Sequence, residues 1–247
     1  MPYRQIQLTT VDSTSNYLQR LQQSGKTVAQ LVVATDFQTH GRGIENNGWF
    51  SSSKTNLLFS LGVDVSFLPA ANQFLITQAV STAIVSVLEK IIPNKKFHIK
   101  WPNDIYFEDK KIVGILISNT VIGSCLSESI IGVGLNVNEE VFPENLPNPI
   151  SLFQITNKKF DLLVLLKQFS EAIFQAIDDL KNPEQLQSLQ NRYTKNLFRY
   201  MKWSSYIIEN KVILAKITGY NEYGHLILED QSKNMFVCDL KQVRFVL

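Results

Sequence analysis

The chain has 247 residues, of which 45% are hydrophobic and 19% are charged, and its formal net charge is +2. The apolar fraction excludes a disordered chain, and the near-neutral charge argues against a protein that binds nucleic acid through bulk electrostatics. No apolar stretch approaches the ~20 residues of a membrane span, and the N-terminus has no apolar signal core. Two cysteines, Cys125 and Cys238, cannot form a disulfide framework, so we expect free thiols and a cytoplasmic protein.

The first half of the chain predicts strands that alternate with helices. Asp12 or Ser13 caps a helix that ends near Gly25, and a second helix is expected over 70–92, with Pro93 beyond its end. The residues between 39 and 48 are polar and rich in glycine, which is typical of a loop. Strands are expected over 30–37, 56–65, 97–101, 111–118 and 129–138.

The second half predicts two helices followed by a run of short strands. The helices are expected over 160–180 and about 183–193. Regularly spaced short strands over 204–209, 211–219, 225–229 and 235–239 favour a small barrel. We place a boundary near Asn196, which gives a first domain over 1–195 and a second over 196–247.

Two loops carry residues suited to binding an anion. Gly41 and Gly43 flank Arg42, so backbone N–H groups and a guanidinium could approach the anion closely, although an ordinary surface loop explains this pattern equally well. Lys100, Asn103 and Asp104 surround the sequence Trp-Pro at the end of a strand. This second loop could bind a phosphate with its Mg²⁺, or be a structural turn with a solvated charge.

Glycines interrupt the two strands that follow. Lys111 stands beside an apolar run in which Gly114 lacks a side chain, so we expect a partly buried cation there and a solvated Lys110. Alternate glycines over 132–134 clear one face of the last strand, and Asn136 could offer a donor and an acceptor to a nucleobase.

Several familiar catalytic motifs are missing from the sequence. It has no phosphate-binding Gly-x-x-x-x-Gly-Lys-Ser/Thr, no Gly-x-Gly-x-x-Gly and no Gly-x-Ser-x-Gly. The three histidines are scattered, which argues against a dedicated transition-metal site.

Taken together and in order, these segments resemble the biotin–protein ligase family, in its monofunctional type without a DNA-binding domain. The resemblance rests on Ser-Thr-x-x-x-Leu over 13–18, Gly-Arg-Gly followed by Trp49, and Lys-Trp-Pro-Asn-Asp over 100–104. Lys-x-x-Gly-Ile-Leu over 111–116 and Gly-x-Gly-x-Asn over 132–136 reinforce it. The resemblance is strong over about residues 10–140.

The resemblance implies an α+β fold in which helices flank a mixed β-sheet, like class II synthetases and biotin–lipoate ligases, with a C-terminal SH3-like β-barrel. It also implies a two-step reaction with ATP and Mg²⁺. Biotin becomes biotinyl-5'-AMP and is then joined to a lysine of a biotin carboxyl carrier domain of a biotin-dependent carboxylase. We expect no DNA or membrane partner, and a monomer or weak homodimer.

The resemblance also assigns roles to residues. Lys111 and Arg42 would be catalytic, and Asp104 would either bind Mg²⁺ or orient Lys100. The biotin site would comprise Ser13, Thr14, Ser15, Gln38, Gly41, Arg42, Gly43, Gly114 and Ile115. The ATP and adenylate site would comprise Arg42, Trp49, Lys100, Asn103, Lys111 and Asn136.

The sequence departs from the family pattern at two places. Ile44 and Glu45 stand where family members often have further basic residues after Gly-Arg-Gly, and Ser118 stands where they often have an acidic residue. These departures affect the expected retention of the adenylate. Other interpretations are a lipoate or octanoate ligase or transferase of the related fold, a degenerate biotin-binding protein, and a biotin-responsive regulator. The regulator would need a DNA-binding domain, for which we expect no room before Asp12.

Overall fold

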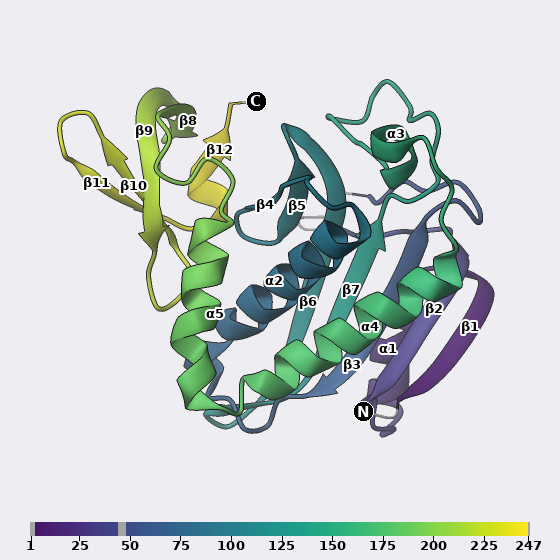
Figure 1. The fold of residues 1–247 in the computed structure, drawn as a ribbon. Helices are drawn as coiled ribbons and strands as arrows, with labels where there is room; N and C mark the ends of the chain where they lie inside the picture. The colour runs from purple at the N-terminus through teal and green to yellow at the C-terminus, as the bar shows by residue number, and fades with distance from the viewer. Residues whose placement is uncertain (1–2, 44–47, 247) are drawn as a thin grey trace.

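The computed structural model describes residues 3–43 and 48–246. Its larger sheet has seven strands in the order β1-β2-β3-β7-β6-β5-β4 (Figure 1). The β1–β2 pair is parallel and every other neighbouring pair is antiparallel, so the sheet is mixed. The strands are β1 Arg4–Val11, β2 Leu31–Gln38, β3 Leu57–Asp64, β4 Phe97–Lys100, β5 Asp104–Phe107, β6 Lys110–Ile122 and β7 Cys125–Leu135.

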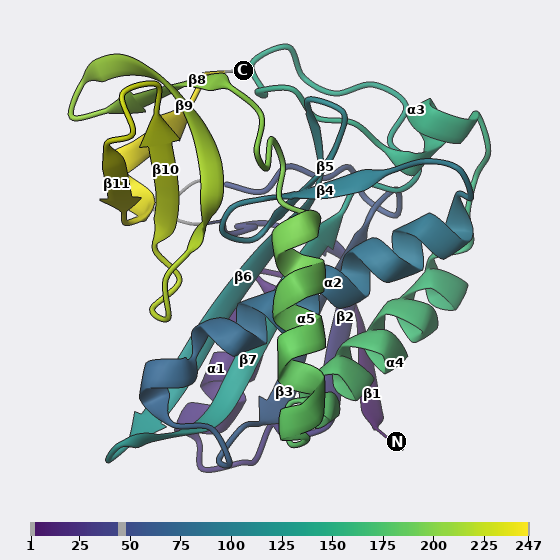
Figure 2. The same cartoon turned by 60° about the vertical axis from the view of Figure 1, so that its left-hand side comes forward.

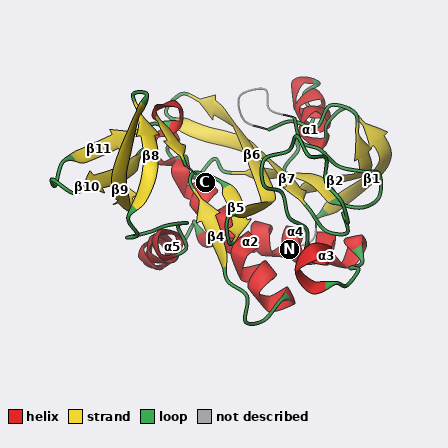
Figure 3. Ribbon diagram, turned by 90° about the horizontal axis from the view of Figure 1, so that it is seen from above, coloured by secondary structure: helices red, strands yellow, loops and turns green. Residues whose placement is uncertain are grey.

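Helices cover both faces of this sheet. Helix α1 (Thr14–Gln23) lies on one face, against β2, β3 and β7. Helices α2 (Phe74–Ile91) and α4 (Leu162–Asp179) pack together on the opposite face, as Figure 3 shows from above. A short 3₁₀ turn (Ala70–Asn72) precedes α2, and α3 (Leu152–Thr156) precedes α4.

A second sheet of five antiparallel strands follows α5 (Pro183–Lys195), which crosses in front of α2 in Figure 2. The strand order is β11-β10-β9-β8-β12, so β11 and β12 are the edges of the ladder. A 3₁₀ turn (Leu240–Gln242) leads into β12. The strands are β8 Ser204–Ile208, β9 Lys211–Tyr220, β10 Leu226–Asp230, β11 Met235–Cys238 and β12 Val243–Phe245. The α+β fold expected from the sequence is confirmed.

The alternation of side chains along β7 explains how this fold makes a pocket. Ile131 and Val133 point into the large core beneath α2 and α4, whereas Ile130 packs with Leu18 of α1 on the other face. Gly132 and Gly134 share the face of Ile130 but have no side chains. The sheet therefore has an open floor next to the start of α1.

Four elements were not expected from the sequence. β1 alternates polar and half-buried residues at a sheet edge, which gives a weak apolar signal, and β12 and α3 are very short. β5 was missed because Asn103-Asp104 is a residue pair typical of turns, whereas Asp104 is the first residue of this strand. All the helices and strands that were predicted are confirmed, within a few residues at their ends.

One helical stretch within the described residues, over 70–91, is long and apolar enough by length and composition to cross a membrane. The expectation that no stretch approaches this length is therefore wrong. However, 67% of its most apolar window is buried inside the fold, where α2 packs against α4 and α5. In this structure the stretch forms the central core helix.

Candidate active site

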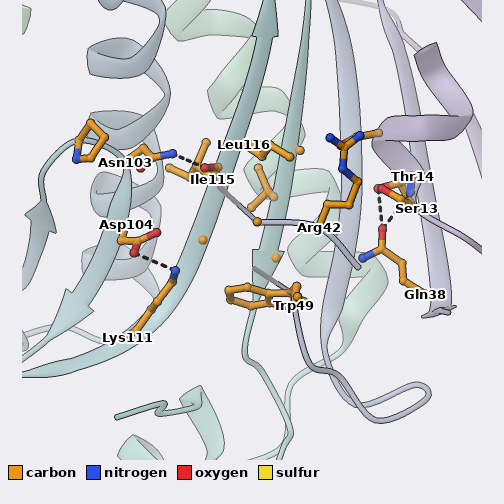
Figure 4. Close-up of a pocket in the computed structure, with 18 of the residues that line it drawn as sticks. Ser13, Thr14, Gln38, Arg42, Trp49, Asn103, Asp104, Lys111, Ile115 and Leu116 are labelled. Carbon is orange, nitrogen blue, oxygen red and sulfur yellow. Dashed lines mark hydrogen bonds and ion pairs between the residues drawn. The ribbon is translucent and has the colours of Figure 1, made fainter. Parts of the chain in front are cut away.

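A cavity of about 240 Å³ opens on the α1 face of the larger sheet. Its walls come from the start of α1, the end of β2, the β4–β5 turn, β6, β7 and the 3₁₀ turn before β12 (Figure 4). The sequence motifs are far apart in the chain, but the sheet order brings them together here. Among the predicted site residues, those that line the cavity are Ser13, Thr14, Ser15, Gln38, Arg42, Gly43, Trp49, Lys100, Asn103, Asp104, Lys111, Gly114 and Ile115.

One end of the cavity is built from hydroxyl groups and an amide. The Gln38 side-chain oxygen accepts hydrogen bonds from the Thr14 backbone N–H at 2.8 Å and from its hydroxyl at 3.2 Å. The Ser60 hydroxyl lies 2.7 Å from Thr14 Oγ1 and 2.9 Å from Ser15 Oγ. The three hydroxyl residues are buried and Gln38 is half-buried. Because these groups hold one another in fixed orientations, this end is suited to a compact ligand with donors and acceptors.

Ser60 is a site residue that sequence analysis missed. It is fully buried in β3 and does not line the cavity itself, but it connects the two hydroxyls that do. A lone serine inside an apolar strand carries no motif. The only signal in the sequence is its polarity among buried neighbours.

The floor of the cavity is made of glycines covered by Trp49. Gly114 of β6 and Gly134 of β7 are paired across the two strands, and the Trp49 indole lies against both, so a Cβ at either position would overlap the ring. A Cβ at Gly132 would similarly overlap the Ser15 hydroxyl. The Trp49 indole N–H is buried and has no hydrogen-bond partner among the described residues. Because this nitrogen lies against Gly134, a ligand can reach it only if the ring moves.

The two ends of the loop expected to bind an anion, near Gly41 and Trp49, are paired with each other. The Trp49 backbone N–H donates to the Gly41 carbonyl at 3.0 Å, and Arg42 and Gly48 form a β-bridge. Gly41 lies outside the cavity lining, and its expected contact with biotin stays a prediction. A Cβ at Gly41 would be 2.6 Å from the Trp49 carbonyl oxygen, so glycine permits the close approach. The departures at Ile44 and Glu45 lie outside the described residues.

Arg42 is exposed at the rim of the cavity. Its guanidinium Nη1 donates to the Asn16 side-chain oxygen at 2.8 Å, and the Asn16 amide donates in turn to Asp12 at 2.9 Å. Arg20 makes two hydrogen bonds of 2.8 Å to the same Asp12 carboxylate. This guanidinium holds the pKa of Asp12 well below its usual range. Arg42 is thus fixed by helix α1 and not by the cavity floor.

Cationic side chains form the other end of the cavity. Lys111 Nζ lies 2.8 Å from Asp104 Oδ2, and the two side chains are 29% and 23% exposed. The same ammonium is 5.6 Å from the centre of the Trp49 ring. Lys110 is exposed, as expected. Burial lowers the pKa of Lys100, which also lines the cavity, while the nearby Asp104 carboxylate opposes that change.

Two predicted nucleotide-binding residues are engaged with backbone. Asn103 is buried and its amide donates to the Ile115 carbonyl, which ties the β4–β5 turn to β6. Asn136 does not line the cavity; its amide donates to the carbonyls of Ile150 at 3.1 Å and Lys111 at 3.4 Å. Its expected contact with adenine stays a prediction, and in this structure it fixes the start of β6.

The sequence pattern of the Biotin/lipoate A/B protein ligase family matches residues 8–136, which is more than half of the chain and includes most of these cavity residues. The chain belongs to this family. An Escherichia coli relative, the bifunctional ligase/repressor BirA, is 28% identical over 232 residues, covering 90% of this chain and 68% of BirA. A Mycobacterium tuberculosis biotin–[acetyl-CoA-carboxylase] ligase is 30% identical over 128 residues, covering 49% of this chain and 46% of that protein.

Solved structures of family members have the same fold. A biotin protein ligase from Aquifex aeolicus, in complex with biotin and ATP, superposes with a TM-score of 0.78 at 24% identity and covers 98% of this chain and 99% of its own. A Helicobacter pylori biotin acetyl coenzyme A carboxylase synthetase with bound biotinylated ATP gives a TM-score of 0.60 at 18% identity. At these identities the similarity establishes the fold of the whole chain, including the C-terminal sheet.

Proposed function

We propose that this chain is a biotin–protein ligase, which forms biotinyl-5'-AMP from biotin and ATP and then transfers biotin to a lysine of a biotin carboxyl carrier domain. The observation that carries the proposal is that the two ends of one cavity differ in chemistry. Hydroxyls and an amide lie at one end, and Lys111 and Lys100 lie at the other. The first end suits the ureido group of biotin, and the second suits a carboxylate that meets a triphosphate. The names and bound ligands of the relatives support this substrate pair.

In the first step a biotin carboxylate oxygen attacks the α-phosphorus of ATP and pyrophosphate leaves. Both reactants are anionic, so their repulsion has to be offset by fixed positive charge. Lys111 is already held within the cavity by Asp104, at a distance of 2.8 Å, and therefore needs little reorganisation to contact these oxygens. Arg42 at the rim adds a second charge when its guanidinium turns from Asn16 toward the phosphate.

In the second step the neutral ε-amine of the carrier lysine attacks the acyl carbon and a C–N bond forms. AMP leaves with the electrons of the broken C–O bond, and one amine proton is released to water. No covalent enzyme intermediate is needed, so the chain requires no activated nucleophile. The Trp49 ring above Gly114 and Gly134 excludes water from the reacting end, which limits hydrolysis of the adenylate.

Mg²⁺ fits this cavity as a partner of ATP. The described residues contain no group of three His, Cys, Asp or Glu side chains that could hold a metal alone. Mg²⁺ commonly binds through one or two carboxylates together with substrate phosphates, and Asp104 supplies one carboxylate beside both lysines. When bound, the ion would neutralise phosphate charge.

Exchange of labelled pyrophosphate into ATP tests the first step. The account predicts exchange that depends on biotin and that lipoate or octanoate does not support at equal concentration. Exchange with lipoate alone would favour the lipoate ligase of the related fold. Binding of labelled biotin without any exchange would indicate a degenerate binding protein and contradict the proposal.

A further inference from the structure

Lys100 is a cation that is held by aromatic rings. Its ammonium lies 5.4 Å from the centre of the Tyr106 ring and 5.0 Å from that of Phe245, and the side chain lines the cavity. Among the described residues no carboxylate lies within ion-pair distance of this ammonium. The nearby acid, Asp104, is paired with Lys111 instead. The charge of Lys100 is therefore available to an anion in the cavity.

One of the two rings comes from the C-terminal sheet. Phe245 is in β12, whose register pairs it with Tyr206 of β8, and the two rings meet edge to face at 5.2 Å. The Phe198 ring stacks against Phe245, with 6.4 Å between the ring centres. Leu240, just before β12, lines the cavity directly. The second sheet thus contributes to the same end of the site as Lys100.

We propose that Phe245 is a positioning residue that keeps the Lys100 ammonium directed into the cavity, where it binds the triphosphate of ATP. This inference rests on the proposed function, since it assumes ATP as the anion. A lysine has a long flexible stem, so two ring faces that attract its charge restrict where that charge can lie. The rings also displace water from the ammonium, which strengthens its attraction to phosphate oxygens.

The charges around Lys100 support a polyanionic ligand. Lys111 is the nearby cation within the cavity, and Asp104 is the nearby acid. Arg199 is a more distant cation outside the cavity lining, and it is paired with Asp109 at 3.8 Å. Among the residues that line this end of the cavity, Lys100 and Lys111 share a single carboxylate, that of Asp104, so positive charge is in excess there. A ligand with several negative charges relieves this excess, whereas the single carboxylate of biotin can be met by Lys111 alone.

Phe245→Leu tests the proposal, because it keeps an apolar side chain but removes the ring face. We expect the KM for ATP in biotin-dependent pyrophosphate exchange to rise about tenfold, with the KM for biotin unchanged. Phe245→Tyr should keep the wild-type KM for ATP. Phe236→Leu is the matched control, since Phe236 is also half-buried in the second sheet but is not among the rings that contact Lys100.

Equilibrium ATP binding should change in parallel, and Phe245→Leu should add nothing once Lys100→Gln has removed the charge. An unchanged KM and Kd for ATP in Phe245→Leu would overturn the inference. So would an equal rise in the KM for both substrates, or the same effect in Phe236→Leu, because either indicates general loosening of the sheet. If wild type shows no exchange with biotin, the proposed function fails, while the ATP-binding comparison still decides the role of Phe245.

Discussion

Lys111 and its neighbour Lys110 show how one strand separates a functional charge from a solvated one. Lys111 points into the cavity and pairs with Asp104 at 2.8 Å, whereas Lys110 is exposed. Replacing Lys111 by Ala removes the charge that offsets repulsion between carboxylate and phosphate. We predict at least a roughly hundredfold loss of biotin-dependent pyrophosphate exchange.

Lys110→Ala is the control for this prediction and should retain wild-type exchange. Thermal unfolding should show that both variants remain folded. If Lys111→Ala retained most of its exchange, the assigned role would be wrong.

Ser60 provides a second test at the level of single residues. Ser60→Ala leaves the hydroxyls of Thr14 and Ser15 without their shared partner, so we predict a higher KM for biotin and a loss of about 1–3 kcal/mol in the free energy of unfolding. Ser129→Ala is the matched control for Ser60→Ala. Ser129 is equally buried, and its hydroxyl donates to the Asn119 side-chain oxygen at 2.7 Å, away from the cavity. It should lose stability without changing that KM. A normal KM in Ser60→Ala would contradict the positioning role.

Site residues that are charged or are glycines could be predicted from the sequence, whereas the residues that hold the site in position could not. Lys111 and Gly114 stood out because a charge or a missing side chain interrupts an apolar strand, and Asp104 stood out as a carboxylate in a turn at a strand end. Ser60 acts only through its neighbours in space, so no local pattern reveals it. The close contact of Gly41 with Trp49 was missed for a similar reason, because it depends on how the chain turns back.

Strands β6 and β7 and the Trp49 segment form the floor of the site as a unit. A methyl group at Gly134 would overlap the Trp49 ring. We predict that Gly134→Ala lowers the free energy of unfolding by about 1–3 kcal/mol and reduces exchange, because the ring has to leave the floor. Combining it with Trp49→Phe should recover part of the stability, since the smaller ring makes room. Wild-type stability in Gly134→Ala would show that the ring does not lie there.

At the scale of elements, periodicity predicted the long helices and the buried strands. α2 and α4 carry many turns of apolar residues, so their signal is strong. β1 is a polar edge strand that is stabilised by pairing with β2, a contact between distant segments. β5 follows directly on turn residues, and only its register with β4 and β6 makes it a strand.

At the scale of the whole molecule, the two sheets are joined by contacts next to the site. The Trp101 indole N–H donates to the Gly224 carbonyl at 2.8 Å, and Gly224 lies against the Phe74 ring. Gly224 has a φ of 88°. We predict that Gly224→Ala costs about 1–2 kcal/mol from backbone strain and about 1–3 kcal/mol more from overlap with Phe74.

Gly123→Ala separates these two costs in a thermal or denaturant unfolding experiment. Gly123 has a φ of 62° and open space around it, so the same substitution should produce only the backbone strain. Equal losses in the two variants would contradict a packed joint between the sheets.

The sequence predicted a second unit beginning near residue 196 but not its contribution to the cavity. Leu240 and Phe245 are more than a hundred residues from Lys100 in the chain, and no motif connects them. Buried side chains form one continuous core through both sheets, from Val32 of β2 to Val243 of β12. The proposed boundary therefore separates two sheets that share one core.

The central claim, that this chain joins biotin to a carrier lysine, is tested most directly by following labelled biotin. The chain is incubated with ATP, Mg²⁺, labelled biotin and a biotin carboxyl carrier domain, and label on the carrier is measured after denaturation. The account predicts ATP-dependent, denaturation-resistant label on a single lysine, which disappears when that lysine is replaced by Arg. An unlabelled carrier, or equal label without ATP, would contradict the account.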